Sequence, residues 1–213
     1  MVRNYRKRSS LVDLKKYIYL ISPNTINKSF YDELPKVLSS NKVKFFQIRI
    51  KKRDRKEIIS VSKKIKKITK KYNVKLIIND SVDIAKTVNA DGCHLGQNDD
   101  NIEYAKKKLK KKIIGMTCHG SKKLCLRALK KKASYLALGS FFKSKLKQNA
   151  RKTKIKILKW AKKEIKIPIV AIGGINDKNY KKLIKAGANY IAISSFIWDN
   201  PDLKPEKAIR KFK

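Results

Sequence analysis

Acidic side chains are scarce in this sequence. Its 213 residues include only 16 Asp and Glu against 56 Lys and Arg, which gives a formal net charge of +40. An acid that recurs at the end of an apolar run is therefore informative. The run "KLIIND" (75–80) ends in Asp80, and "DGCHLGQNDD" (91–100) leads from apolar residues to Asp99 and Asp100.

The sequence also has few cysteines and no long apolar run. Cys93, Cys118 and Cys125 are odd in number and lack CxxC spacing, so we expect reduced thiols rather than disulfides or a zinc site. No run approaches the roughly 18 apolar residues of a membrane span, and the basic N-terminus lacks the pattern of a secretory signal. No Pro/Gly-rich linker divides the chain. We expect one cytoplasmic domain (1–213) without a membrane partner, which begins with a basic N-terminal extension at about residues 1–15.

The basic excess raises the question of nucleic-acid binding, because Lys and Arg that neutralise phosphates dominate that affinity. Here the basic residues are mostly lysines and are spread over the whole chain. Within residues 54–72, Ile58, Val61, Ile65 and Ile68 recur at helical spacing and leave the lysines on the outer face. We interpret the charge as a solvated exterior and expect no specific nucleic-acid partner, although incidental polyanion binding would follow from it.

Short apolar runs alternate with amphipathic stretches along the chain. Such alternation predicts parallel strands, because each crossover returns the chain to the same edge of the sheet. Eight units predict an α/β fold of the (β/α)8 TIM-barrel type, with a doubly wound open sheet as the alternative. The predicted strands are 17–21, 44–49, 75–79, 92–95, 112–117, 134–139, 167–173 and 189–194. The predicted helices are 54–72, 82–89, 100–111, 121–132, 154–165 and 177–187, with a less regular helical segment at 28–40.

Chemistry in a TIM barrel belongs at the C-terminal ends of the strands, where the sequence places a cationic group. Gln47, Arg49 and Lys51 occupy alternate positions, so they share one face of their strand. Lys147 follows a later strand and could join them around an anion. A solvated strand edge is an equally good interpretation of these residues by themselves.

Asp80 and Asp99 form a second, acidic group, because they follow neighbouring strands. Their carboxylates could converge on one hard cation such as Mg2+, which prefers a few carboxylates together with phosphate oxygens. Helix N-capping is the competing interpretation for both, since Asp is favoured where a helix begins.

Small residues form a third group after the last two strands, at Gly173, Gly174, Ser194 and Ser195. Backbone N–H groups at this place in a TIM barrel commonly hold a phosphate. The three groups together predict a magnesium-diphosphate site on the second to fourth strands, beside a monophosphate site on the seventh and eighth.

Seven ordered segments resemble the thiamine phosphate synthase family: "FQIRIK", "LIINDSVDIA", "NADGCHLGQND", "IIGMTCH", "LGSFFKSKLK", "IPIVAIGGIN" and "AGANYIAISSFIW". The resemblance implies a Mg2+-dependent transferase of thiamine biosynthesis, and a homo-oligomer is possible. Such an enzyme joins hydroxymethylpyrimidine diphosphate to thiazole phosphate, releasing diphosphate and forming thiamine monophosphate. In this family the diphosphate is thought to leave first, so that the thiazole nitrogen captures a pyrimidine-methyl cation and no protein nucleophile is needed.

The resemblance also implies site residues, with Arg49, Lys51 and Lys147 as the catalytic ones. Those implied for the pyrimidine diphosphate are Gln47, Arg49, Lys51, Asn79, Thr117 and Lys147. Those implied for the thiazole phosphate are Ser144, Lys145, Leu146, Gly174, Ser194 and Ser195. Asp80 and Asp99 would hold Mg2+.

Two segments depart from the family pattern. Ile50 replaces a usual Glu, and residues 143–147 replace a Pro-Thr-x-Thr-Lys pattern, so Lys143 and Lys145 could contact a carboxylated thiazole instead. Two alternative functions remain: a thiazole tautomerase, for which His119 is the residue to examine, and a non-catalytic polyanion-binding barrel. We expect His94, inside a strand, to be a packed and hydrogen-bonded histidine.

Overall fold

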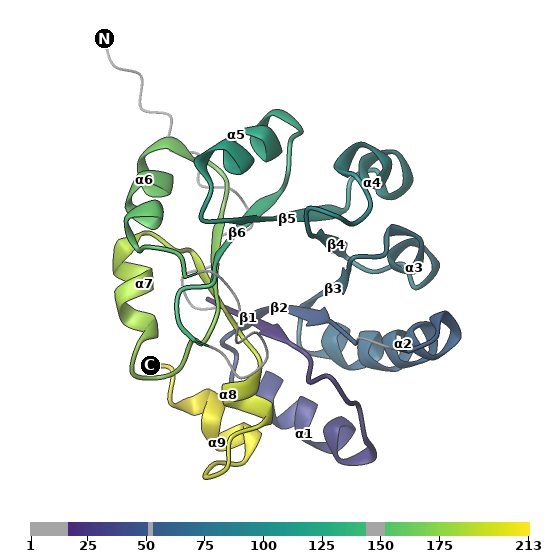
Figure 1. Cartoon of the computed structure of the whole chain (residues 1–213). Coiled ribbons are helices and arrows are strands. Elements are labelled where there is room, and N and C mark those ends of the chain that lie inside the picture. Colours follow the sequence, from purple (N-terminus) through teal and green to yellow (C-terminus); the bar gives the residue numbers. More distant parts are fainter. Residues whose placement is uncertain (1–16, 51–52, 144–151) are drawn as a thin grey trace.

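The computed structural model describes residues 17–50, 53–143 and 152–213. Its eight parallel strands close into a barrel in sequence order, with helices around the outside (Figure 1). The predicted TIM barrel is confirmed, and the open-sheet alternative is wrong. The strands are β1 (Ile18–Ile21), β2 (Val43–Ile48), β3 (Lys75–Asn79), β4 (Gly92–Leu95), β5 (Ile113–His119), β6 (Tyr135–Gly139), β7 (Ile169–Ile172) and β8 (Tyr190–Ile193). The predicted basic extension at about 1–15 lies outside the described residues.

The helices include all seven predicted segments and two short ones after β8 that the periodicity did not reveal. The first seven are α1 (Lys28–Leu38), α2 (Arg55–Lys71), α3 (Val82–Thr87), α4 (Ile102–Leu109), α5 (Lys122–Lys130), α6 (Lys156–Glu164) and α7 (Tyr180–Ala186). The additional two are α8 (Ser195–Trp198) and α9 (Pro205–Arg210). In the described ranges, no helix is both long and apolar enough to cross a bilayer.

Two apolar layers hold the barrel together, because side chains alternate between the barrel interior and the space under the helices. Along β2, Phe45 belongs to the interior cluster, whereas Phe46 and Ile48 belong to the cluster shared with the helices. Gln47 occupies the next interior position after Phe45 and is 3% exposed. The interior is thus apolar at the start of β2 and polar near its C-terminal end. All three cysteines are buried and free, as expected.

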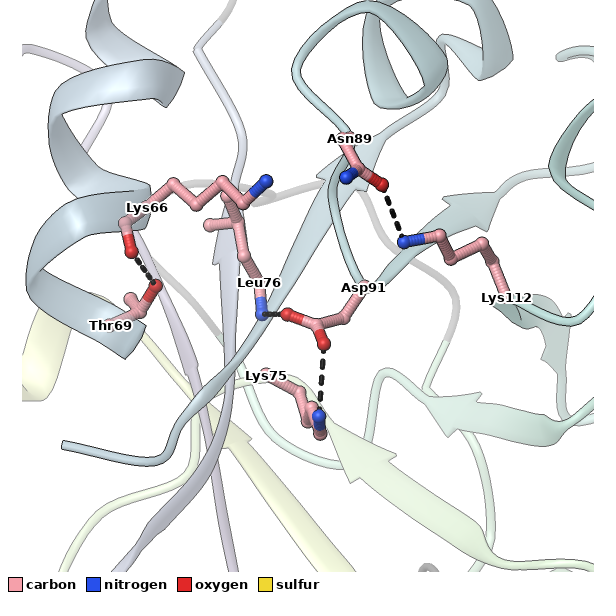
Figure 2. A network of polar contacts seen from close by, with 7 residues as sticks. All are labelled: Lys66, Thr69, Lys75, Leu76, Asn89, Asp91 and Lys112. Carbon is pink, nitrogen blue, oxygen red and sulfur yellow. Dashed lines mark hydrogen bonds and ion pairs between the residues drawn. The ribbon is translucent and has the colours of Figure 1, made fainter. Parts of the chain in front are cut away.

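Asp91 organises the opposite, N-terminal end of the barrel, just before β4 (Figure 2). Its carboxylate accepts hydrogen bonds from the Leu76 backbone N (2.9 Å) and from Lys75 Nζ (3.0 Å). Its own backbone N–H donates to Leu76 O (2.9 Å), and its carbonyl accepts from Ile113 N (3.0 Å). One residue therefore ties together the starts of β3, β4 and β5.

We expect Asp91→Ala to lower the free energy of unfolding by about 1–3 kcal/mol, because the partly buried Leu76 N–H loses its carboxylate acceptor. Asp91→Asn keeps an acceptor oxygen and loses only the ion pair with Lys75, whose side chain is 44% exposed, so its cost should stay below about 1 kcal/mol. Urea unfolding of both variants measures the difference. Equal losses would assign the effect to the ion pair instead.

Candidate active site

Ser22, directly after β1, connects the C-terminal ends of three neighbouring strands. Its backbone N–H donates to Gln47 O (2.9 Å), and its Oγ accepts from the Arg49 backbone N (3.0 Å). Its carbonyl accepts from Ser194 Oγ (3.1 Å). Arg49 and Ser194, which were predicted to serve different phosphate groups, are therefore both bonded to one buried residue. Sequence reasoning missed Ser22, whose only signal is its position after an apolar run.

The end of β3 is held against β4. Asn79 pairs with His94 in the parallel register, and the Asp80 backbone N donates to His94 O at 2.8 Å. Asp80 is exposed and has φ +65°, a left-handed conformation that Asp adopts more readily than most residues with a side chain. Asp99, after β4, is also exposed, and its carboxylate accepts from the Gly96 N–H at 2.6 Å.

Neither Asp80 nor Asp99 caps a helix, so the capping interpretation is wrong for both. The N-cap of α3 is Ser81, whose side chain accepts from Ile84 N. The N-cap of α4 is Asn101, whose side chain accepts from Tyr104 N. Asp80 stands one residue too early to be the cap of α3, and Asp99 two residues too early to be that of α4.

A third acid, Asp100, lies close to the same strand end and has a structural partner. Its carboxylate accepts from the backbone N–H of Val82, the first residue of α3, at 3.0 Å. The pKa of Cys93 in β4 is raised by burial first, and then by the negative charges of Asp100, Asp80 and Asp99. A negative field is therefore concentrated here in a chain of strongly positive net charge.

Two exposed carboxylates are the candidate metal ligands at this end of the barrel. Among the residues that the structure describes, no three His, Cys, Asp or Glu side chains are grouped closely enough to hold a metal by themselves. Asp80 and Asp99 offer two exposed carboxylates, a set that suits Mg2+ when substrate phosphate oxygens complete the coordination.

The loop after β7 requires glycine at two positions. Gly173 has φ +106° and Gly174 has φ +59°, and a Cβ on Gly174 would lie 2.2 Å from the carbonyl oxygen of Lys143. The Phe142 N–H donates to Gly173 O (3.0 Å), so this loop packs directly on the segment after β6. Close backbone packing, rather than turn formation alone, therefore fixes both glycines.

Gly174→Ala should lower the free energy of unfolding by more than about 1 kcal/mol, because alanine combines a positive φ with a backbone clash. Gly120→Ala is the matched control. At Gly120 no positive φ is present, and the three atoms nearest to an added Cβ all belong to the side chain of Thr153, the first of them at 2.9 Å. Chemical unfolding of both variants is the measurement, and a cost at Gly120 as large as that at Gly174 would contradict the argument.

Polar side chains also line the interior just below the rim. Gln47 donates from Nε2 to Tyr19 Oη (3.1 Å). His94 is 8% exposed, stacks on the Tyr135 ring with centroids 5.6 Å apart, and lies 2.8 Å from Thr117 Oγ1 through its Nε2. The prediction of a packed, hydrogen-bonded His94 is confirmed. Sequence reasoning missed Tyr19 and Tyr135, which were counted only as apolar strand residues.

Several predicted site residues can be placed and several cannot. Gln47, Arg49, Asn79, Asp80, Asp99, Thr117, Gly174, Ser194 and Ser195 all lie at or just beyond the C-terminal ends of the strands. Lys51, Ser144, Lys145, Leu146 and Lys147 lie outside the described residues, so their roles stay predictions. His119 ends β5, is exposed, and has φ +51°.

Comparisons with known proteins agree with this geometry. The sequence model of a family described as thiamine monophosphate synthase matches residues 18–197. The thiamine-phosphate synthase of Pelagibacter ubique (strain HTCC1062) is 51% identical over 200 residues, covering 93% of this chain and 97% of that protein. That of Erythrobacter litoralis (strain HTCC2594) is 35% identical over 195 residues, covering 89% and 92%. The solved structure of thiamine phosphate pyrophosphorylase from Pyrococcus furiosus superimposes with a TM-score of 0.83 at 32% identity, covering 93% of this chain and 94% of that one. The chain therefore belongs to the thiamine monophosphate synthase family.

Proposed function

We propose that this chain catalyses the joining of hydroxymethylpyrimidine diphosphate to thiazole phosphate, with release of diphosphate and formation of thiamine monophosphate. Membership of the family makes the chain a thiamine-phosphate synthase, a transferase. The observation that carries the substrate proposal is the junction at Ser22, because it holds Arg49 and Ser194 at the same part of the rim. Two phosphorylated substrates could meet there with their reacting atoms over the barrel mouth.

The diphosphate would lie over the ends of β2 and β3, within reach of Arg49 and Asn79. Arg49 supplies a planar cation that can bond two phosphate oxygens at once. Its backbone is held by Ser22, which limits how far the strand end can move. We assign Lys51 and Lys147 to the same diphosphate as predictions from the family pattern, with Gln47 and Thr117 on the pyrimidine side.

Asp80 and Asp99 would hold Mg2+ against the diphosphate. Their exposure and their freedom from helix capping support this assignment, as does the concentration of negative charge around β4. When bound, the ion would stabilise the negative charge that grows on the departing diphosphate. The residues of the chain would add preformed positive charge and hydrogen-bond donors at the same oxygens.

The thiazole phosphate would lie over the ends of β7 and β8. Gly174, Ser194 and Ser195 are there, and the packing of the Gly173–Gly174 loop supports a rigid backbone at this place. We assign Ser144, Lys145 and Leu146 to the same phosphate from the family pattern alone. In this arrangement no side chain acts as a nucleophile, since the work of the protein is to orient two substrates and to stabilise the leaving group.

One incubation tests the proposal. Purified protein with hydroxymethylpyrimidine diphosphate, thiazole phosphate and Mg2+ should release diphosphate and form a product with the mass of thiamine monophosphate. Removal of Mg2+ with a chelator should abolish both signals, and restoring Mg2+ should recover them. Conversion of the thiazole phosphate without coupling would favour the tautomerase alternative. No conversion of either substrate would favour the polyanion-binding alternative.

A further inference from the structure

A continuous chain of hydrogen bonds crosses the barrel interior from the end of β2 to the end of β5. Gln47 Nε2 donates to Tyr19 Oη (3.1 Å), and Tyr19 Oη lies 2.7 Å from Tyr135 Oη. Tyr135 Oη lies 2.9 Å from His94 Nδ1, and His94 Nε2 lies 2.8 Å from Thr117 Oγ1. The first four side chains are each 8% exposed or less, and Thr117 is half-buried. Both ends of this chain are residues to which the proposed function assigns the pyrimidine substrate.

The donor at one end fixes the direction of every bond. Tyr19 accepts from the Gln47 amide, so its single hydroxyl proton goes to its other partner, Tyr135. Tyr135, accepting from Tyr19, must then donate its own proton to His94 Nδ1. Burial raises the pKa of Tyr19 and of Tyr135, so both keep the hydroxyl protons that this pattern uses.

The direction of the chain also fixes the tautomer of His94 and the orientation of the Thr117 hydroxyl. Because Nδ1 accepts from Tyr135, the ring proton is on Nε2, where it is donated to Thr117 Oγ1. Thr117 accepts this bond and therefore turns its own hydroxyl proton away from His94. His94 pairs with Gly115, two residues before Thr117, so the Thr117 hydroxyl lies nearer the C-terminal end of the barrel.

We propose that Tyr19, Tyr135 and His94 are positioning residues. Tyr19 and Tyr135 hold His94 in its Nε2–H tautomer, and His94 thereby directs the Thr117 hydroxyl proton to an acceptor atom of the bound pyrimidine diphosphate. This inference rests on the proposed function for the identity of the ligand. It assigns to three buried side chains a role that neither their packing nor the rim residues by themselves would require. The three act through Gln47 and Thr117 and do not touch the substrate.

The tautomer can be read directly by NMR. The sequence has two histidines, so protein labelled with [15N]histidine gives two ring systems, and the variant His119→Gln identifies the signals of His94. We expect a protonated Nε2 and an unprotonated Nδ1 in the wild-type protein. Tyr135→Phe removes the donor to Nδ1 while keeping the ring, and should give a mixture of both tautomers. A proton on Nδ1 of the wild-type protein would overturn the proposal, because the neutral ring would then accept at Nε2 and the Thr117 hydroxyl would donate inward to it.

Substrate binding supplies the second readout. With Mg2+ present, calorimetry should show about tenfold weaker binding of hydroxymethylpyrimidine diphosphate to Tyr135→Phe and Tyr19→Phe, and unchanged binding of thiazole phosphate. Tyr190→Phe is the matched control, because Tyr190 contributes a ring to the same interior layer without being a member of the chain, and its affinity should stay within twofold. If the two tyrosines had a purely structural role, their variants would bind both ligands equally more weakly. That result would also overturn the proposal.

The NMR and binding measurements separate this inference from the proposed function. If the wild-type protein formed no thiamine monophosphate, the proposed function would be rejected. The NMR result would still decide the direction of the hydrogen bonds from Gln47 to Thr117. Normal product formation by the wild-type protein, together with unchanged His94 signals and unchanged pyrimidine affinity in Tyr135→Phe, would reject the positioning role alone.

Discussion

Replacing Asp80 with Asn should lower turnover by about 100- to 1,000-fold and leave the fold intact. The loss is expected because the variant lacks the proposed carboxylate ligand of Mg2+, at the place where negative charge would develop on the leaving diphosphate. Asn is the preferred substitution because it tolerates φ +65° about as well as Asp does. Asp80→Ala should lose as much activity, and should also lose up to about 1 kcal/mol of stability from the left-handed backbone.

The Mg2+ concentration that gives half-maximal rate distinguishes a metal ligand from a general structural role. It should rise in Asp80→Asn, since Asp99 would remain as the single carboxylate. Asp91→Asn is the matched control, because it removes a carboxylate from the opposite end of the barrel, and its dependence on Mg2+ should equal that of the wild-type protein. Wild-type turnover by Asp80→Asn at limiting Mg2+ would exclude the metal role.

The fold was predictable from the sequence because two periodicities alternate along the whole chain. All eight strands and the irregular helix at 28–40 are found, with strand ends that differ from the predicted ones by two residues or fewer. The helices α8 and α9 were missed for a physical reason: they have four and six residues, too few to show a helical repeat. Pro205, at the first turn of α9, was the one local signal.

The rim was predictable where it depends on strand ends, and unpredictable where it depends on contacts across the barrel. Asp80 and Asp99 could be read from the apolar runs that precede them. The role of Ser22 depends on bonds to β2 and β8, and no local pattern encodes them. Tyr19 and Tyr135 look apolar in a linear sequence, and their hydroxyls become partners only when β1 and β6 face each other across the closed barrel.

The capping interpretation shows how much an offset of one or two residues matters. At Asp80 and Asp99 the sequence left both interpretations open, because Asp, Ser and Asn are all favoured N-caps. Ser81 and Asn101 are the actual caps. Neither Asp80 nor Asp99 is therefore a helix cap, a result that local propensity could not decide.

Replacing Arg49 with Ala should lower kcat/KM for hydroxymethylpyrimidine diphosphate by about 100- to 1,000-fold, because the leaving diphosphate loses a cation held in preformed geometry. Arg49→Lys keeps the charge and loses the planar pair of donors, so it should recover only part of this loss. Arg53→Ala is the matched control: Arg53 lies on the same connection but is exposed and pairs with Glu57 of α2 at 3.2 Å. Steady-state kinetics of the three variants, at constant ionic strength, is the measurement.

This comparison separates a local site from the general field of the protein. With 56 Lys and Arg in the chain, removing any one changes the overall charge by a small fraction. At physiological salt the Debye length is about 8 Å, so distant lysines cannot replace a cation in contact with the diphosphate. A large loss at Arg49 and none at Arg53 would therefore require a specific contact. Equal and small losses at both positions would mean that only bulk charge attracts the substrate, which is the behaviour of a polyanion-binding barrel.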